Sequence, residues 1–260
     1  MATYLFIIVE LNQAMLNPEH LLVPYQTSPL PPGPWLVFAP HADDETYGMG
    51  GSLLKASSEN METHVVVMTD GALGGEAENL VAVRQQEVQA AAATLGVESL
   101  QCWNEPDRGL AFNERLLDKI SRTVLELAPA SIFFPGPLEV HPDHRATALL
   151  VWAALQKLQQ QNSKNSLSFT PFAYDISVQN PVNCLIDITA QRAAKEKAMA
   201  IYASQNSQNN YEDIILALNK ARTFSLLPEV SHAEGFYRFS GEELSLSLKV
   251  VTRKIIDLYF

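Results

Sequence analysis

The sequence predicts a single α/β domain built on a doubly wound, mostly parallel sheet with helices on both faces. Short apolar segments end at Gly or Pro, and longer segments with apolar residues at helical spacing lie between them. The short segments are apolar throughout instead of alternating, which is typical of parallel strands covered on both faces. The length of 260 residues is enough to bury a substantial core within one large domain.

The predicted strands are short runs rich in β-branched or aromatic residues. Three are expected at residues 35–39 (WLVFA), 64–71 (HVVVMTDG) and 131–137 (SIFFPGP). Two more are expected at residues 171–178 and 183–189. Their alternation with helical patterns favours a parallel order for the main part of the sheet.

The predicted helices end at residues that commonly terminate helices. The helix over 79–97 stops near Gly96, and the helix over 113–129 stops at Pro129. Further helices are expected over 191–204 and 211–224. The C-terminal residues 244–260 are mixed, and their alternating first half fits a peripheral strand or an oligomer contact equally well. A homo-oligomer is therefore a possible assembly.

The first 34 residues differ from the rest of the chain. Residues 24–34 hold five prolines, which lack a backbone donor and favour an extended connector. We expect residues 1–34 to form an N-terminal extension and residues 35–260 the main domain. The extension would cover either a sheet edge or an adjacent subunit.

Composition limits the partners and the location. The net charge of −11, without a Lys/Arg cluster, disfavours nucleic-acid binding. Cys102 and Cys184 form no C-x-x-C pair and are expected to be buried thiols in a reducing compartment. The apolar start of the chain lacks a basic region and is interrupted by Glu10, so we expect no transmembrane segment and a cytoplasmic location.

Two polar motifs follow predicted strands. "PHADDE" begins directly after residues 35–39, and "EVHPDHR" follows the strand at 131–137, about a hundred residues later. In a doubly wound sheet, ligands bind at the carboxyl ends of the strands, so both motifs are expected at one edge. Their imidazoles and carboxylates suit zinc or another divalent transition metal, which would also offset the carboxylate repulsion. The candidate set is His41, Asp43, Asp44, Glu45, Glu139, His141, Asp143 and His144.

The spacing of these residues suggests roles for some of them. His41 and Asp44 are three positions apart and can face one ion from a tight turn, with a third ligand from the second motif and an open position for water. Such an ion lowers the pKa of its bound water to about 7. Asp43 is the natural general base, and an imidazole such as His141 would stabilise the oxyanion or protonate the leaving amine. These groups fit metal-assisted amide hydrolysis.

Several segments together resemble one family. "PHADDE" and "HPDHR", with "VVVMTDGALGG", "VRQQEVQAAAATLGV", "NEPDRGL", "YASQ" and "EGF", are similar to the PIG-L or LmbE-like zinc-dependent de-N-acetylases over roughly residues 35–236. The resemblance implies a Rossmann-like fold and removal of the N-acetyl group from a substrate that contains N-acetylglucosamine. The expected partner is thus a small amino-sugar conjugate.

The resemblance also implies site residues. His41, Asp44 and His144 would bind zinc, Asp43 would be the general base, and His141 would stabilise the oxyanion or act as acid. Asp143 would orient His141 from behind, and Arg84 would contact the substrate. The family usually has proline where this chain has Ala42, so we expect other contacts to hold this turn.

Some of these residues have a simpler interpretation. Asp44 and Glu45 would suit the start of a helix. Arg84 would pair with Glu87 on a helix surface, and Asp70 would only shape a turn. Glu139 would orient His141 or remain a solvated loop residue. Tyr202, Ser204 and Gln205 in "YASQ" would pack near the site or form a helix end, and Trp103 and Trp152 are expected in the core.

Three other functions remain open from the sequence. The same chemistry would serve an amidase acting on another acylated amine or thiol conjugate. A sugar- or headgroup-binding protein without turnover is disfavoured by the intact Asp43 and His141. A metal phosphoesterase usually uses two ions, for which the motifs offer few well-placed ligands.

Overall fold

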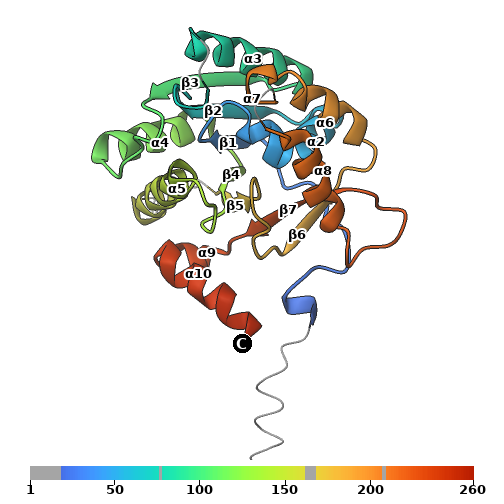
Figure 1. The fold of residues 1–260 in the computed structure, drawn as a ribbon. Coiled ribbons are helices and arrows are strands. Elements are labelled where there is room, and N and C mark those ends of the chain that lie inside the picture. The colour runs from blue at the N-terminus through green and yellow to red at the C-terminus, as the bar shows by residue number, and fades with distance from the viewer. Residues whose placement is uncertain (1–18, 76–77, 162–167, 207–208) are drawn as a thin grey trace, which may run out of the picture.

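The computed structural model describes residues 19–75, 78–161, 168–206 and 209–260. Seven strands form one sheet in the order β3-β2-β1-β4-β5-β7-β6 (Figure 1). The pairs from β3 to β5 are parallel, whereas β7 runs antiparallel to both β5 and β6, which confirms the mostly parallel α/β fold. The strands are β1 (Trp35–Ala39), β2 (Thr63–Thr69), β3 (Ser99–Glu105), β4 (Ser131–Pro135), β5 (Thr170–Tyr174), β6 (Cys184–Asp187) and β7 (Ala233–Arg238).

The order of the strands places a switch point between β1 and β4. From β1 the chain moves outward through β2 to β3, then crosses back to pair β4 with the other side of β1. Trp35 lies opposite Ser131 in this parallel pair, so both strands end at the same edge. The loops after them diverge to opposite faces, which opens the crevice where ligands bind in such sheets.

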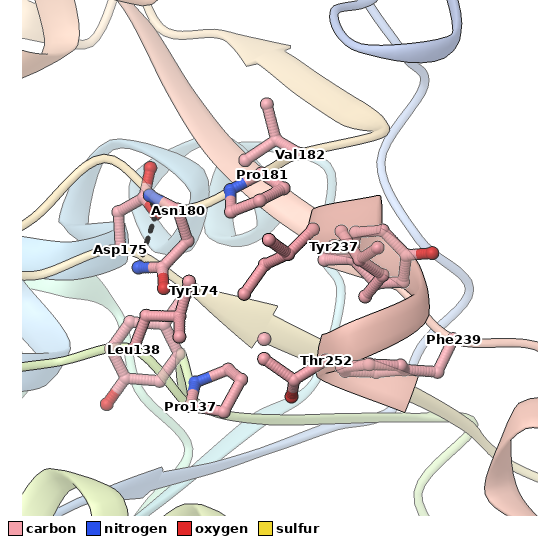
Figure 2. A pocket seen from close by; sticks show the side chains of 13 residues that line it. Pro137, Leu138, Tyr174, Asp175, Asn180, Pro181, Val182, Tyr237, Phe239 and Thr252 are labelled. Carbon is pink, nitrogen blue, oxygen red and sulfur yellow. Dashed lines mark hydrogen bonds between the residues drawn. The ribbon is translucent and has the colours of Figure 1, made fainter. Parts of the chain in front are cut away.

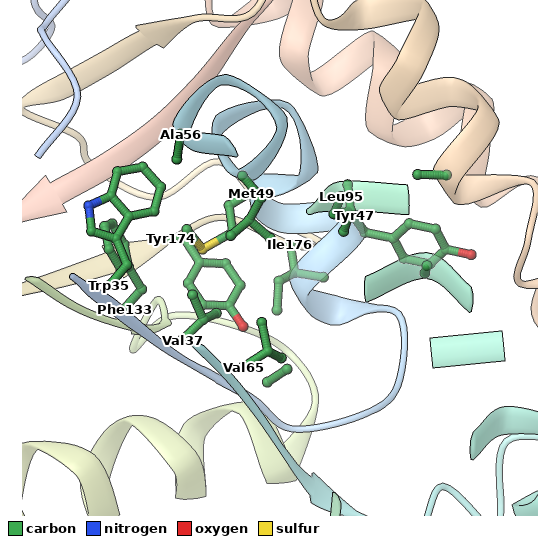
Figure 3. Packing of buried hydrophobic residues seen from close by; sticks show 14 of the residues in the cluster. Trp35, Val37, Tyr47, Met49, Ala56, Val65, Leu95, Phe133, Tyr174 and Ile176 are labelled. Carbon is green, nitrogen blue, oxygen red and sulfur yellow. The ribbon is translucent and has the colours of Figure 1, made fainter. Parts of the chain in front are cut away.

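Helices cover both faces of the sheet, and the two faces hold separate cores. Trp35, Val37 and Ala39 point into the first core, part of which Figure 3 shows, whereas Leu36 and Phe38 point into the second. The first face carries α2 (Asp44–Ser58), α3 (Leu80–Leu95), α6 (Arg192–Met199) and α8 (Tyr211–Ala221). The second carries α4 (Glu114–Leu127), α5 (Pro142–Gln161), α9 (Gly241–Leu244) and α10 (Leu248–Ile256). The remaining short helices are η1 (Glu19–Leu21), α7 (Ala203–Asn206) and η2 (Asp257–Tyr259).

Most predicted elements are present, and the exceptions have physical causes. Gly96 takes φ 73° directly after α3, as a left-handed helix end requires. The expected helix over 191–204 is divided into α6 and α7. A peripheral strand at the C-terminus was the wrong alternative, because residues 248–256 form α10. Its buried Leu248, Val251 and Ile255 follow helical spacing, and the Ser247 side chain caps its first turn.

α2 contains a kink that a buried ion pair supports. Met49 has non-helical angles of φ −146° and ψ 23°, so the second half of the helix begins anew. The carboxylate of Glu234 on β7 accepts the Gly51 and Ser52 N–H groups at 2.8 and 2.7 Å. Lys195 of α6 lies 2.7 Å from this carboxylate, and both side chains are fully buried. The Glu234 carboxylate therefore accepts N–H groups at the start of the second half of the helix, and Lys195 balances its charge.

The described part of the N-terminal extension packs on the domain. The Ser28 N–H donates to the Leu185 carbonyl of edge strand β6 at 2.7 Å. Trp35 and Ser131 donate side-chain hydrogen bonds to the carbonyls of Pro31 and Pro32. These contacts fit the prediction that the extension covers a sheet edge, while the domain boundary at residue 35 stays a prediction.

The two cysteines are free thiols at opposite edges of the sheet. Cys102 lies on β3, and the buried Cys184 lies on β6. Among the described residues, none of the helices combines the length and the apolar character that crossing a bilayer requires.

Candidate active site

The two predicted motifs meet at the carboxyl edge of β1 and β4. "PHADDE" forms the turn from β1 into α2, and "EVHPDHR" leads from the loop after β4 into α5. The ring of His41 lies 4.6 Å from that of His141 and 5.3 Å from that of His144, measured between centroids. Nitrogen atoms of the three rings lie within 4.8 Å of one another. The structure thus brings together residues that are a hundred positions apart, as the sequence predicted.

The turn before α2 is held by contacts to its backbone. Thr69 donates its N–H and its hydroxyl to the Pro40 carbonyl at 2.9 and 2.8 Å. The Arg84 guanidinium donates to the Ala42 carbonyl at 2.8 Å. Asp43 takes φ 130°, a conformation that costs a non-glycine residue roughly 1–3 kcal/mol. These bonds explain how the turn forms with alanine in place of the usual proline.

Asp44 lies between two histidines. Its Oδ2 atom is 3.0 Å from His41 Nδ1 and 3.3 Å from His144 Nε2. Two ligands on a tetrahedral zinc with bonds of about 2.0–2.1 Å lie about 3.3 Å apart. Burial alone would raise the pKa of Asp44, but the charge of His144 and hydrogen bonds from both rings lower it instead. Both distances from Asp44 are close to those expected between neighbouring ligands of one ion.

Each of these histidines has a carboxylate at its other ring nitrogen. His41 Nε2 lies 3.3 Å from Asp143 Oδ2 and 3.4 Å from Asp107 Oδ1. His144 Nδ1 lies 3.5 Å from Glu139 Oε2. Metal-binding histidines usually have such a partner, which fixes the ring and its tautomer. Both histidines therefore have a nearby carboxylate of the kind that accompanies metal-binding histidines.

Glu139 and Asp143 contact different histidines from those that the sequence suggested. Glu139 is buried rather than solvated, accepts the N–H of Ile176 at 2.9 Å, and faces His144 instead of His141. The Asp143 carboxylate faces His41, because the loop after β3 holds it there through the backbone N–H of Arg108 at 2.6 Å. Asp143 instead reaches His141 through its backbone N–H, and its role in orienting that ring stays a prediction.

His141 is oriented by a backbone group. The Asp143 N–H donates to its Nδ1 atom at 3.2 Å. An Nδ1 that accepts a hydrogen bond leaves the proton of the neutral ring on Nε2, an assignment made from this bond. Burial lowers the pKa of His141, and the nearby charge of His41 lowers it further. The ring is thus a neutral donor through Nε2.

Asp43 and Arg84 form a buried pair beside this cluster. Arg84 Nη2 lies 3.2 Å from Asp43 Oδ2, and Arg84 is only 3% exposed. Burial raises the pKa of Asp43 to about 8, against the opposing charge of Arg84. A surface pair between Arg84 and Glu87 is wrong, because Glu87 instead accepts the Ser204 N–H at 2.8 Å.

Glu45 belongs to the start of α2, as expected, yet it is completely buried. One carboxylate oxygen accepts the Asp43 N–H at 3.2 Å, and the other accepts the hydroxyls of Thr46 and Tyr202. Burial raises its pKa. Tyr202 therefore packs next to the site and supports the residue behind Asp43 and Asp44.

Asp107 is a site residue that the sequence analysis did not single out. It follows β3 within "NEPDRGL", so its position after a strand end was the available signal. Asp70 holds the backbone at Asp107 in place, because its Oδ1 accepts the N–H groups of Asp107 and Ala72 at 3.1 Å each. Burial opposes ionisation of Asp107, but hydrogen bonding and the charge of His41 lower its pKa to about 2.

A cavity of about 880 Å³ opens above these residues. A second cavity, shown in Figure 2, has only about 20 Å³, enough for one water or so, and contains none of the predicted site residues. Trp152 is buried in the second core as predicted, and Trp103 packs partly against that core. The lining of the large cavity includes His41, Asp43, Asp44, Arg84, Asp107, His141, His144 and Gln205.

Comparison with known proteins finds relatives that share the family of this chain. The model of the PIG-L family, described as GlcNAc-PI de-N-acetylase, matches residues 36–155. A probable N-acetyl-alpha-D-glucosaminyl L-malate deacetylase 2 from Bacillus anthracis is 30% identical over 183 residues, covering 65% of this chain and 80% of that protein. Diacetylchitobiose deacetylase from Thermococcus kodakarensis is 25% identical over 195 residues, covering 68% and 72%. The solved structure of N,N'-diacetylchitobiose deacetylase from Pyrococcus horikoshii superposes with a TM-score of 0.71 at 25% identity, covering 82% and 86%.

Proposed function

The chain belongs to the PIG-L family, and on this premise we propose that it is a metal-dependent hydrolase that removes the N-acetyl group from a substrate containing N-acetylglucosamine. The observation that carries the proposal is the grouping of Asp43 and His141 with the set around Asp44 in one cavity. The amino-sugar deacetylases among the relatives support the substrate class.

The proposed metal ligands are His41, Asp44 and His144. The distances from Asp44 Oδ2 to His41 Nδ1 and His144 Nε2, 3.0 and 3.3 Å, support a shared ion. Zn²⁺ is the expected ion, and another divalent transition metal has the same donor preference. When bound, the ion lowers the pKa of a water and polarises the acetyl carbonyl.

Asp43 is the proposed general base. It takes a proton from the attacking water as the carbon–oxygen bond forms, and the proton ends on the amine nitrogen as the carbon–nitrogen bond breaks. The products are acetate and the free amine. Arg84 positions the Asp43 carboxylate at 3.2 Å, and its contact with the substrate stays a prediction.

His141 is the proposed donor to the developing oxyanion. Its Nδ1 accepts the Asp143 N–H, so its Nε2–H is available to a substrate oxygen. The lowered pKa favours this neutral donor over a charged acid that would protonate the leaving amine. Asp143 supports the site by holding His41 and by orienting His141 through its backbone.

The test is acetate release from N-acetylglucosamine and its conjugates, with and without added zinc. Asp43→Asn is expected to reduce the rate about 10²- to 10⁴-fold while the metal stays bound. Release from other acylated amines or thiol conjugates, but not from amino sugars, would favour the broader amidase. Binding without turnover would favour a headgroup-binding protein. A cytoplasmic location and a homo-oligomer stay predictions.

A further inference from the structure

We propose that the substrate carries an apolar group beyond its N-acetylglucosamine ring. This inference rests on the proposed function, because it assigns the sugar to the part of the cavity that holds Asp43 and His141. The apolar group would occupy the outer part of the same cavity.

Large apolar side chains are exposed around the mouth of the cavity. Leu73, Val140, Tyr211 and Ile214 all line it, with exposed fractions of 58%, 69%, 37% and 49%. They come from separate places, namely the loop after β2, the loop after β4 and helix α8. Exposed apolar groups that gather around one concavity mark a binding site for an apolar ligand. We name these four residues the apolar rim.

The apolar rim is continuous with the candidate catalytic residues. Val140 directly precedes His141, the proposed oxyanion donor, and both residues line the cavity. The Tyr211 ring lies 5.8 Å from that of Tyr47, which also lines the cavity. Ile214 is one helical turn further along α8, on the same side of the helix. A group attached to the sugar would pass directly from the reacting end onto this rim.

The chain itself offers little cationic attraction to an anionic group in the cavity. Arg84 is already committed to Asp43 and to a backbone carbonyl. Among the described lining residues, Arg108 is the other Lys or Arg side chain, and it is exposed, so solvent screens its charge. The proposed metal ion would offset the charge of the carboxylates that line the cavity, so the apolar rim is the feature that selects the attached group.

The cavity also has room for more than one sugar ring. Its volume of about 880 Å³ lies in the upper part of the range of roughly 300–1,000 Å³ that holds drug-sized ligands. Because the apolar rim lines this cavity, an apolar group that packs against the rim removes apolar surface from water on both sides. Each fully buried methylene contributes about 0.8 kcal/mol, or roughly fourfold in affinity.

The experiment compares three glycosides of N-acetylglucosamine that differ only in the attached group: methyl, butyl and carboxymethyl. Steady-state kcat and KM are measured on the zinc-loaded protein, and binding of each glycoside is measured by calorimetry. We expect the butyl glycoside to have a KM at least tenfold below that of the methyl glycoside, with similar kcat. Contacts that are equal in ground and transition states change KM alone.

Variants locate the effect. Val140→Ser and Ile214→Ser should each reduce the ratio of methyl to butyl KM severalfold, because each removes part of the apolar rim. The matched control is Leu125→Ser on α4, an equally exposed leucine at 53% that lies outside the lining of the cavity, and it should leave the ratio unchanged. Thermal melting of all three variants confirms that they fold.

Equal KM values for the methyl and butyl glycosides would overturn the inference. So would a preference for the carboxymethyl glycoside, especially one that Arg108→Gln abolishes. Tighter calorimetric binding of the butyl glycoside without acetate release from any glycoside would leave the apolar site standing and overturn the proposed reaction. These outcomes distinguish failure of the apolar site from failure of the proposed deacetylation.

Discussion

The buried pair of Lys195 and Glu234 offers a sharp test of how the first face is stabilised. We expect Lys195→Met to destabilise the protein by about 3–5 kcal/mol, the cost of leaving one charge of a buried pair uncompensated. The Glu234 carboxylate cannot simply withdraw, since it also accepts the Gly51 and Ser52 N–H groups at the kink of α2. The ammonium contributes further bonds to Tyr47 O and Asn219 Oδ1 at 2.8 and 2.9 Å.

The assay is urea unfolding at neutral pH, followed by circular dichroism, with the melting temperature as a second readout. A loss of 3–5 kcal/mol should lower the melting temperature by roughly 10 °C in a chain of this size. The control is Glu196→Gln, which breaks the exposed i,i+4 pair with Arg192 at 3.4 Å. That change should cost at most about 0.5 kcal/mol, because both groups are about 45% exposed and screened.

The double variant Lys195→Met/Glu234→Gln separates charge from shape. It removes both charges while retaining an acceptor for the helix N–H groups, so it should be less destabilised than the sum of the two single variants. A single Lys195→Met variant no less stable than Glu196→Gln would refute the reasoning. If the double variant lost as much stability as the two single variants together, the two charges would not interact, and this result would also refute the reasoning.

Three further predictions concern the candidate site. Asp43→Asn should lower kcat about 10²- to 10⁴-fold with little change in KM, and Asn tolerates the positive φ of this position. Removing metal with a chelator should abolish acetate release and lower the melting temperature. Adding zinc at a hundred times its Kd should then restore about 2.7 kcal/mol of stability, measured by thermal melting. Glu139→Gln should weaken zinc binding about 10- to 100-fold, measured by competition with a chromogenic chelator, because His144 loses its carboxylate partner.

Each of these predictions has a contrary result. Unchanged turnover in Asp43→Asn would remove this residue as the base. Full activity after exhaustive chelation, verified by metal analysis, would contradict the metal requirement. Wild-type zinc affinity in Glu139→Gln, with Glu114→Gln on the surface of α4 as the control, would mean that the 3.5 Å contact does not support His144.

Local sequence patterns were sufficient for five of the seven strands in the described sheet and for much of the site. The strands β3 and β7 were not predicted, because polar residues interrupt their apolar ones. The buried strands are apolar throughout, and both polar motifs follow strand ends, so His41, Asp44 and His144 were identifiable before their contacts were known. The partners of the acidic residues were not identifiable, because they depend on loops distant in sequence. Asp143 faces His41 only because the Arg108 N–H of another loop holds its carboxylate.

The contacts that stabilise the kink of α2 were not predicted either, because they too join elements distant in sequence. Glu234 reaches across from β7 to N–H groups about 180 residues away, and its charge is balanced from a third element. No periodicity or spacing encodes such an arrangement. At the C-terminus, the alternation of Leu and Ser over residues 244–248 suggested a strand, whereas helical spacing of the apolar residues after it gave α10.

The bond from Arg84 to the Ala42 carbonyl has a consequence for sequence variation at this position. The carbonyl oxygen of residue 42 is present whatever side chain that residue has. The Arg84 guanidinium can therefore hold the turn at Ala42 without the ring that proline would supply. Proline would restrict the turn through its fixed φ, whereas Arg84 holds it from another element through the backbone alone. Because Ala42 is itself buried, the space around its side chain limits what can stand at position 42, and the bond from Arg84 does not depend on that choice.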